Sequence, residues 1–416
     1  MKRAYLSFWT ILLICFLSSN VFAVSEAALL FLLISPSPRA NGMGTTYMAL
    51  PANDAYAVIF NPGYLGVFAM ENYVSVGVYP HSVQWLPGFT DDLFYNSKAA
   101  NIGFKLNKYI FAGIGYHKIY LDLGEQVITR EQSPEPIGYF HSWEKARALS
   151  MGIGGHFGVK IGLGMSVKYA ESQLGVMKSG AEYETTKADI FAYDFGGILQ
   201  IPVFEMLNTS INLPFSNKLT LIPLLVPSLG YSIGNYGGEI SYIDPAQADP
   251  IPRVARVGYS IDSGISLGRK NSRWKLVSFK WAREAEDLLV KREPPDYEIK
   301  YQTGLGDIDF CHDLIEWKPN PIIIKKEGWE INCLETFYFR EGEYNDPEGK
   351  VIYQTTGYGV GIAGLFQLAS ILFPTNESIK FFANHVDVQY HWSEMETAAG
   401  HPLEGTKFKG INLVIR

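Results

Sequence analysis

Short segments that alternate apolar with small or polar residues recur along most of the 416-residue chain. In Ile161–Tyr169, every second residue is apolar, and the residues between them are Gly, Ser and Lys. Asn384–Trp392 alternates Val, Tyr and Trp with His, Asp and Gln. Because successive side chains of a strand point to opposite faces, each segment predicts a β-strand with one apolar face and one small or polar face.

The apolar residues are spread through these strands instead of gathering into spanning helices. Mean hydropathy is only +0.02, and after the N-terminus no convincing run of ~18 apolar residues occurs. The nearest, Gly357–Phe373, is uncharged but rich in glycine, which disfavours a helix. A closed barrel is the other structure that satisfies every backbone group in lipid. We therefore predict an all-β fold, a transmembrane antiparallel β-barrel of about 14 strands, formed by residues 71–416.

A soluble β-sandwich also alternates and is the alternative to this barrel. In several segments, however, a glycine-rich or charged face lies opposite a continuous aliphatic and aromatic face, as in a barrel with a polar lumen. Tyr390 and Trp392 are expected in an aromatic girdle at the membrane interface. The residues expected to face the lumen are Lys168, His385, Asp387, Gln389 and His391.

The predicted strands differ in the length of their connections. We expect strands at 73–79, 102–106, 110–116, 149–156, 161–169, 188–200, 219–233, 237–242, 253–267, 274–281, 298–304, 329–339, 353–362, 384–392 and 408–415. Long loops rich in Pro and charged residues are expected at 80–97, 121–145, 171–187, 283–296, 306–327 and 340–350. Residues 364–373 would form a short helix over the barrel mouth or extend a strand.

The N-terminus has the composition of an export signal. Lys2 and Arg3 precede the apolar run Phe8–Leu17, and Val21–Ala23 ends it with a small-residue cleavage site. A membrane anchor is the weaker alternative, because polar residues interrupt the apolar run. We therefore predict a signal peptide at residues 1–23 and export to the outer membrane of a Gram-negative-type bacterium.

The possible motifs for catalysis and metal binding lie in sequence contexts that do not fit those functions. The chain is therefore predicted not to be an enzyme and to need no cofactor. Gly264–Gly268 matches G-x-S-x-G around Ser266, but it lies in a predicted strand and not in the required strand-to-helix turn. His385 and His391 would lie about 20 Å apart on one strand, too far to share an ion. The net charge of −7 gives no basic footprint for nucleic acid. Cys311 and Cys333 could form at most one optional disulfide.

The stretch Leu32–Leu65 is punctuated by Pro, Gly and Asn between the signal and the first strand. It resembles the N-terminal signature of the PorV/PorQ family of outer-membrane proteins, which is itself similar to FadL-type transporters of hydrophobic compounds. The resemblance implies that residues 24–70 form a hatch that plugs the barrel. Arg39 could pair there with an inward carboxylate or face solvent. The residues that carry the resemblance are Pro38, Arg39, Gly42, Met43, Gly44, Asp54, Ala55, Asn61 and Pro62.

Two functions follow from this resemblance. Likeness to PorV implies a non-enzymatic component of type IX secretion that binds the translocon or its cargo, and this is the reading that the closer signature favours. Likeness to FadL implies passive uptake of a hydrophobic compound such as a long-chain fatty acid. Both place the chain in contact with outer-membrane lipid. The C-terminus ends in Ile415-Arg416 without the terminal aromatic residue usual in such barrels.

Overall fold

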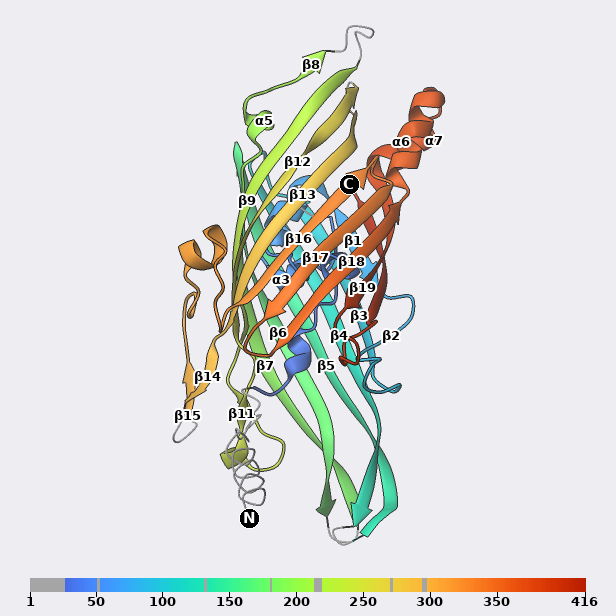
Figure 1. Ribbon diagram of the computed structural model, residues 1–416. Helices are drawn as coiled ribbons and strands as arrows, with labels where there is room; N and C mark the ends of the chain where they lie inside the picture. The colour runs from blue at the N-terminus through green and yellow to red at the C-terminus, as the bar shows by residue number, and fades with distance from the viewer. Residues whose placement is uncertain are drawn as a thin grey trace, which may run out of the picture.

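The computed structural model describes residues 27–50, 53–130, 133–179, 182–212, 219–269, 272–293 and 298–416. The predicted signal peptide, residues 1–23, lies outside them. Within the described residues, 14 antiparallel strands form a closed barrel, because β1 pairs with both β20 and β3 (Figure 1). The fold class predicted from the alternation is thus confirmed.

The barrel strands follow one another around the ring in chain order. They are β1 (Val74–Val78), β3 (Phe94–Lys105), β4 (Ile110–Arg130), β5 (Ser133–Phe157), β6 (Val159–Ser179), β7 (Glu182–Gln200), β9 (Thr220–Tyr236), β12 (Val254–Arg269), β13 (Ser272–Leu288), β16 (Ile324–Cys333), β17 (Phe337–Asp346), β18 (Val351–Gly361), β19 (Val386–Glu396) and β20 (Lys407–Ile415).

Shorter elements lie in the lumen and in the connections. The luminal ones are η1 (Leu30–Leu33), α2 (Pro38–Asn41), α3 (Ala57–Phe60) and α4 (Tyr64–Glu71). Those in the connections are β2 (Val83–Gln84), α5 (Val203–Met206), β8 (Ile211–Asn212), β10 (Glu239–Ile240), η2 (Pro245–Gln247), β11 (Asp249–Pro250), β14 (Val290–Glu293), β15 (Glu298–Tyr301), η3 (Phe310–Ile315), α6 (Ala363–Leu372) and α7 (Glu377–His385). Among the residues described, no helix is both long enough and apolar enough to cross a membrane.

The two rims of the barrel differ. We call the end where β1 begins and β20 ends the C-terminal rim, since Val74 pairs there with Ile415. Tight turns such as Gly158 and residues 106–109 lie at this rim, whereas the β4–β5 and β6–β7 hairpins project far beyond the other, distal rim (Figure 1). Outer-membrane barrels keep short turns on the periplasmic side and long loops outside.

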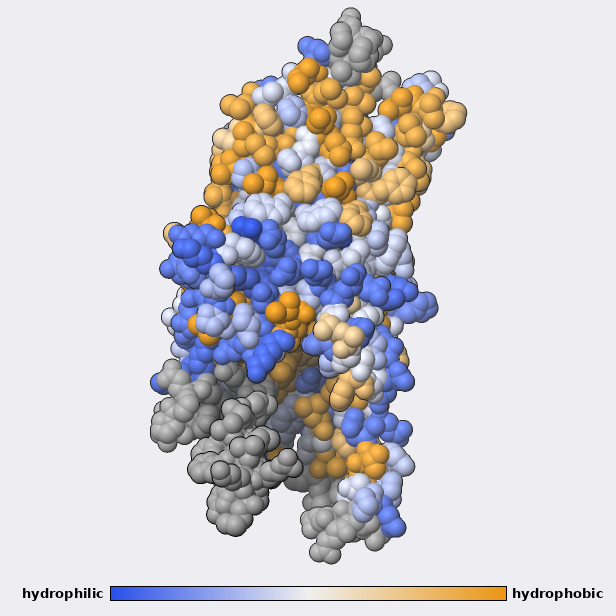
Figure 2. Space-filling model, viewed as in Figure 1, coloured by the Kyte–Doolittle hydropathy of each residue, from blue (hydrophilic) through white to orange (hydrophobic). Residues whose placement is uncertain are grey.

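An apolar band covers the half of the barrel nearer the C-terminal rim on the face seen in Figure 2. On β5, the outward Leu149, Met151 and Ile153 are each more than half exposed, whereas Ser150 between them is fully buried. Phe339, Tyr358 and Trp392 form a row of outward rings with neighbouring centroids 5.2 Å apart, and the Tyr390 ring lies 6.1 Å from that of Trp392. Exposing so large an apolar surface to water would be unfavourable, whereas contact with the hydrocarbon of a membrane is favourable.

Several predicted boundaries are wrong. Residues 121–145, 171–187 and 340–350, expected as loops, are mostly strand, because backbone pairing continues beyond the apolar band. Residues 329–339 hold a turn between β16 and β17 instead of one strand. Residues 237–242 and 298–304 contribute only small sheets outside the ring. The helix alternative for 364–373 is correct, but α6 packs on α7 and projects from the C-terminal rim (Figure 1).

Candidate functional site

Residues 27–72 run through the barrel from one rim to the other (Figure 1). Near the distal rim, the amide of Ala28 donates to the Pro250 carbonyl at 2.8 Å. At the C-terminal rim, the amide of Tyr73 donates to the Ile415 carbonyl at 2.8 Å as the chain enters β1. We call residues 27–72 the luminal segment, and its contacts with the wall define the candidate site.

One side of the luminal segment lies directly on a wall of glycines. A Cβ atom on Gly164 would lie 2.2 Å from the Pro62 carbonyl oxygen, and one on Gly162 would lie 2.2 Å from that of Gly63. A Cβ on Gly66 in α4 would lie 2.2 Å from the Ile153 carbonyl oxygen. Because glycine has no side chain, the inner faces of β5 and β6 allow the backbone of the luminal segment to approach closely. The sequence pattern identified these faces but not what they contact.

Asn61 ties the luminal segment to the next strand. Its side-chain amide donates to the carbonyls of Gly197 at 2.9 Å and Met48 at 3.2 Å, and its oxygen accepts from the amide of Gly63 at 3.0 Å. Pro62 follows and contacts the β6 glycines. Asn61 therefore stabilises the turn before α4 and joins the luminal segment to β7.

Asp54 organises the middle of the luminal segment. One carboxylate oxygen accepts from the Tyr56 amide at 3.0 Å, and the other accepts from the hydroxyls of Ser37 and Tyr47. The neighbouring Ala55 reaches the wall on two sides: its amide donates to Asn412 at 3.2 Å, and its carbonyl accepts from Asn101 at 3.0 Å. These bonds join the starts of α2 and α3 to two barrel strands, β3 and β20.

The remaining signature residues form the turn around α2. Pro38 occupies the first position of α2, and Ser37 caps this helix by accepting from the Ala40 amide at 3.1 Å. A Cβ on Gly42 would lie 2.8 Å from the Gly357 backbone, and Gly44 has φ +63°, which favours glycine. Met43 between them is fully buried against the wall.

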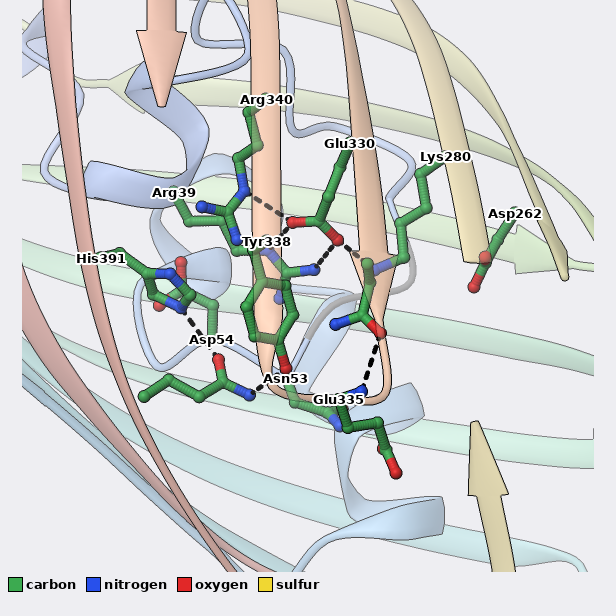
Figure 3. Close-up of polar contacts among 12 residues, drawn as sticks. Arg39, Asn53, Asp54, Asp262, Lys280, Glu330, Glu335, Tyr338, Arg340 and His391 are labelled. Atoms are coloured by element: carbon green, nitrogen blue, oxygen red, sulfur yellow. Dashed lines mark hydrogen bonds and ion pairs between the residues drawn. The ribbon is translucent and has the colours of Figure 1, made fainter. Parts of the chain in front are cut away.

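A buried ionic cluster joins the luminal segment to the wall on the side away from the glycines (Figure 3). Arg39 binds Glu330 of β16 through two hydrogen bonds of 2.9 and 2.6 Å. The same carboxylate accepts from Lys280 of β13 at 2.7 Å and from Arg340 of β17 at 2.6 Å. Glu330 and Arg340 are fully buried, and Arg39 and Lys280 are 4 % and 5 % exposed. The Glu330 carboxylate therefore accepts hydrogen bonds from three cationic side chains. Of the two alternatives for Arg39, the structure has the pairing with an inward carboxylate and not exposure to solvent.

Four of the five predicted lumen-facing residues are buried inside the barrel. Lys168 binds Asp194 at 3.1 Å, Gln389 donates to Asp387, and His391 Nε2 lies 2.9 Å from Gln389 Oε1. His385 is the exception and is exposed, because α7 continues to His385 and β19 begins only at Val386. The strand pattern was extended two residues too far there.

Two parts of the lumen differ: a packed cluster of apolar side chains fills one part, which we call the apolar compartment, and a cavity lies in the other. Toward the distal rim, an apolar compartment is lined by a chain of rings, with centroids 6.0 Å apart for Tyr56–Tyr79, 6.1 Å for Tyr79–Tyr95 and 6.2 Å for Tyr95–Phe408. Leu29, Phe31 and Leu32 fill it, together with Ile119 and Leu121 of the wall. The sequence did not predict this compartment, because it is formed by residues far apart in the chain, such as Tyr95 and Phe408.

Toward the C-terminal rim lies a polar chamber of about 300 Å³. Among its lining residues are Lys280, Asp262, Glu335 and Arg416. The carboxylate of Asp262 lies 3.5 Å from the Lys275 ammonium, and Arg416 lies 3.3 Å from Glu335.

The other sequence candidates occupy positions without catalytic geometry. Ser266 lies within β12 and not on a strand-to-helix turn, so the arrangement of a nucleophile elbow is absent there. Cys311 and Cys333 are both free and exposed. Among the described residues, no group of three or more His, Cys, Asp or Glu side chains could hold a metal ion.

The fold defines a β-barrel of the outer-membrane type whose lumen holds an N-terminal segment of the same chain. No family model and no curated protein matches the chain. Among solved structures, it is similar to the CymD monoaromatic hydrocarbon channel, with 11 % identity, 92 % of this chain and 96 % of that chain covered, and a TM-score of 0.37. It is also similar to the Pseudomonas putida toluene transporter TodX, with 10 % identity, 90 % of this chain and 96 % of that chain covered, and a TM-score of 0.36. A Pseudomonas aeruginosa FadL homologue is similar too, with 8 % identity, 92 % and 97 % of the two chains covered, and a TM-score of 0.37. At these values the likeness concerns barrel architecture alone.

Proposed function

We propose that the protein is a passive outer-membrane channel for a hydrophobic small molecule, with the luminal segment as its hatch. The observation that carries the proposal is the apolar compartment near the distal rim, whose space is taken by Phe31 and Leu32 of the chain itself. An apolar ligand of similar size would gain the same burial if these side chains moved away. The C-terminal rim, with the tight turns at Gly158 and residues 106–109, would face the periplasm, and the distal rim with the long hairpins would face the outside.

Passage would require the hatch to rearrange. Along the glycine wall the plug backbone touches the barrel backbone, so this side leaves no space for a ligand. On the opposite side, the Arg39–Glu330 pair joins the plug to the wall above the polar chamber. A hydrophobic molecule would therefore bind in the apolar compartment first, and movement of α2 and the residues around it would open the way to the chamber.

Replacing both Phe31 and Leu32 by serine is expected to tighten the binding of an apolar ligand at least 10-fold. Each fully buried side chain of this kind contributes about 1.5–3 kcal/mol of burial, which a ligand must otherwise displace. Binding of labelled oleate to the protein in lipid nanodiscs, corrected with empty nanodiscs, measures the change. Leu30→Ser is the matched control, because Leu30 lies between them in the chain yet is 51 % exposed. Equal affinities for the double variant and the control would refute the proposal.

The second candidate function is the type IX secretion role implied by the resemblance to PorV. Its supporting observation is that the β4–β5 and β6–β7 hairpins project far beyond the distal rim, where a protein outside the membrane could bind them (Figure 1). We rank it second, reversing the preference drawn from the signature, because it does not account for the apolar compartment. In a deletion strain, loss of surface delivery of type IX cargo with normal growth on fatty acids would favour this role; the opposite pattern would favour hydrophobic uptake.

A further inference from the structure

Three cations form a row across the outer surface of adjacent barrel strands. Lys98 of β3 is directly opposite Lys118 of β4, and Lys118 is directly opposite Arg147 of β5. Lys98 and Arg147 are exposed and Lys118 is partly exposed, so all three point away from the lumen. Like charges directly opposite each other destabilise a sheet, so such a row calls for a compensating anion.

The protein itself supplies little compensation. Among the residues that the structure describes, no acidic side chain forms an ion pair with Lys98 or Lys118. Arg147 lies 3.8 Å from Glu171, but the same carboxylate is closer to Lys145, at 2.9 Å. Arg147 thus shares the Glu171 carboxylate with Lys145, and this carboxylate does not reach Lys98 or Lys118.

The row lies at the distal edge of the apolar band. One step toward the C-terminal rim, Ala100, Tyr116 and Leu149 face outward, and the next row is Ile102, Ile114 and Met151. One step toward the distal rim, the polar residues Tyr120 and Lys145 face each other. The cations therefore occupy the level at which lipid headgroups meet the acyl chains.

We propose that Lys98, Lys118 and Arg147 form a binding site for the headgroup phosphates of an anionic lipid in the leaflet at the distal side. The strands are about 4.8 Å apart, so one phosphate group can accept hydrogen bonds from two neighbouring cations. The guanidinium of Arg147 suits bidentate binding of phosphate, and the two ammonium groups add point charges. The bound lipid would neutralise the like charges and hold β3, β4 and β5 in register.

The test compares Lys98→Gln/Lys118→Gln with Lys105→Gln/Lys108→Gln. The second pair removes the same charge from exposed lysines near the other end of the same two strands. Native mass spectrometry measures retention of bisphosphorylated lipid A and of its dephosphorylated form, after heat-modifiable migration has shown that each variant is folded. We expect the first variant to lose retention of the phosphorylated lipid at least 10-fold and the second to retain it.

Three results would overturn the site. They are equal losses for both variants, no loss for the first variant, or equal retention of the dephosphorylated lipid by the unaltered protein. Complete displacement of the lipid by inorganic phosphate at millimolar concentration would also overturn it, because the anion would then be free phosphate and not a headgroup.

Discussion

Glu330→Gln is expected to loosen the luminal segment by about 3 kcal/mol of local stability. The substitution leaves Arg39, Lys280 and Arg340 in the lumen without the carboxylate that all three contact. Removing one partner of a buried ionic group costs about 3–5 kcal/mol, because the remaining charges stay desolvated. We expect the lower value, since Arg39 and Lys280 border the polar chamber, where water can reach them in part.

Hydrogen exchange at α2 measures this effect. The amides of Asn41 and Gly42 donate to the carbonyls of Ser37 and Pro38, so their exchange reports opening of the helix that carries Arg39. A loss of about 3 kcal/mol corresponds to roughly 100-fold faster exchange.

The matched control for this experiment is Glu394→Gln. Glu394 forms a surface ion pair with Lys407 at 3.2 Å, and such pairs contribute about 0–1 kcal/mol. In an Arg39→Gln/Glu330→Gln double variant, less destabilisation than the sum of the single variants would demonstrate coupling. Similar exchange rates in the Glu330 and Glu394 variants would show that the cluster does not hold the plug.

Gly164→Ala is expected to push the luminal segment off the glycine wall. The new Cβ would lie 2.2 Å from the carbonyl oxygen and 2.4 Å from the carbonyl carbon of Pro62, and a backbone group cannot rotate away as a side chain can. Overpacking of this kind costs about 1–3 kcal/mol. The amides of Tyr64 and Leu65, which donate to Asn61 and Pro62, should therefore exchange about 10-fold faster, and ion conductance in planar bilayers should rise.

Gly238→Ala serves as the control for this steric effect. A Cβ on Gly238 would have no heavy atom within 4 Å, so the same chemical change there should alter neither exchange nor conductance. If Gly164→Ala behaved like the control, close backbone packing would not be what seats the plug.

Strands were predicted correctly where apolar residues alternate regularly with small or polar ones, and wrongly where this alternation is missing. Ile161–Tyr169 and the segment around Leu149 faced lipid on one side and the plug on the other, so their alternation was complete and their faces were predicted correctly. Beyond the apolar band, as in 121–145, strands rich in polar residues lack the alternation, and their composition led to the wrong prediction of a loop. His385 was misplaced because neither alternation nor composition marks the residue at which α7 gives way to β19.

The sequence by itself determined the class of the molecule, because a period of two across many segments, without a spanning helix, leaves a closed barrel as the structure that satisfies its backbone in lipid. It also marked Arg39 and Asn61 as residues of a special N-terminal stretch. Only the tertiary structure decided their partners, Glu330 and Gly197, and the positions of the apolar compartment and the polar chamber in the lumen. Closure of the ring brings together residues separated by almost 300 positions, and no local pattern records which inward faces meet the plug.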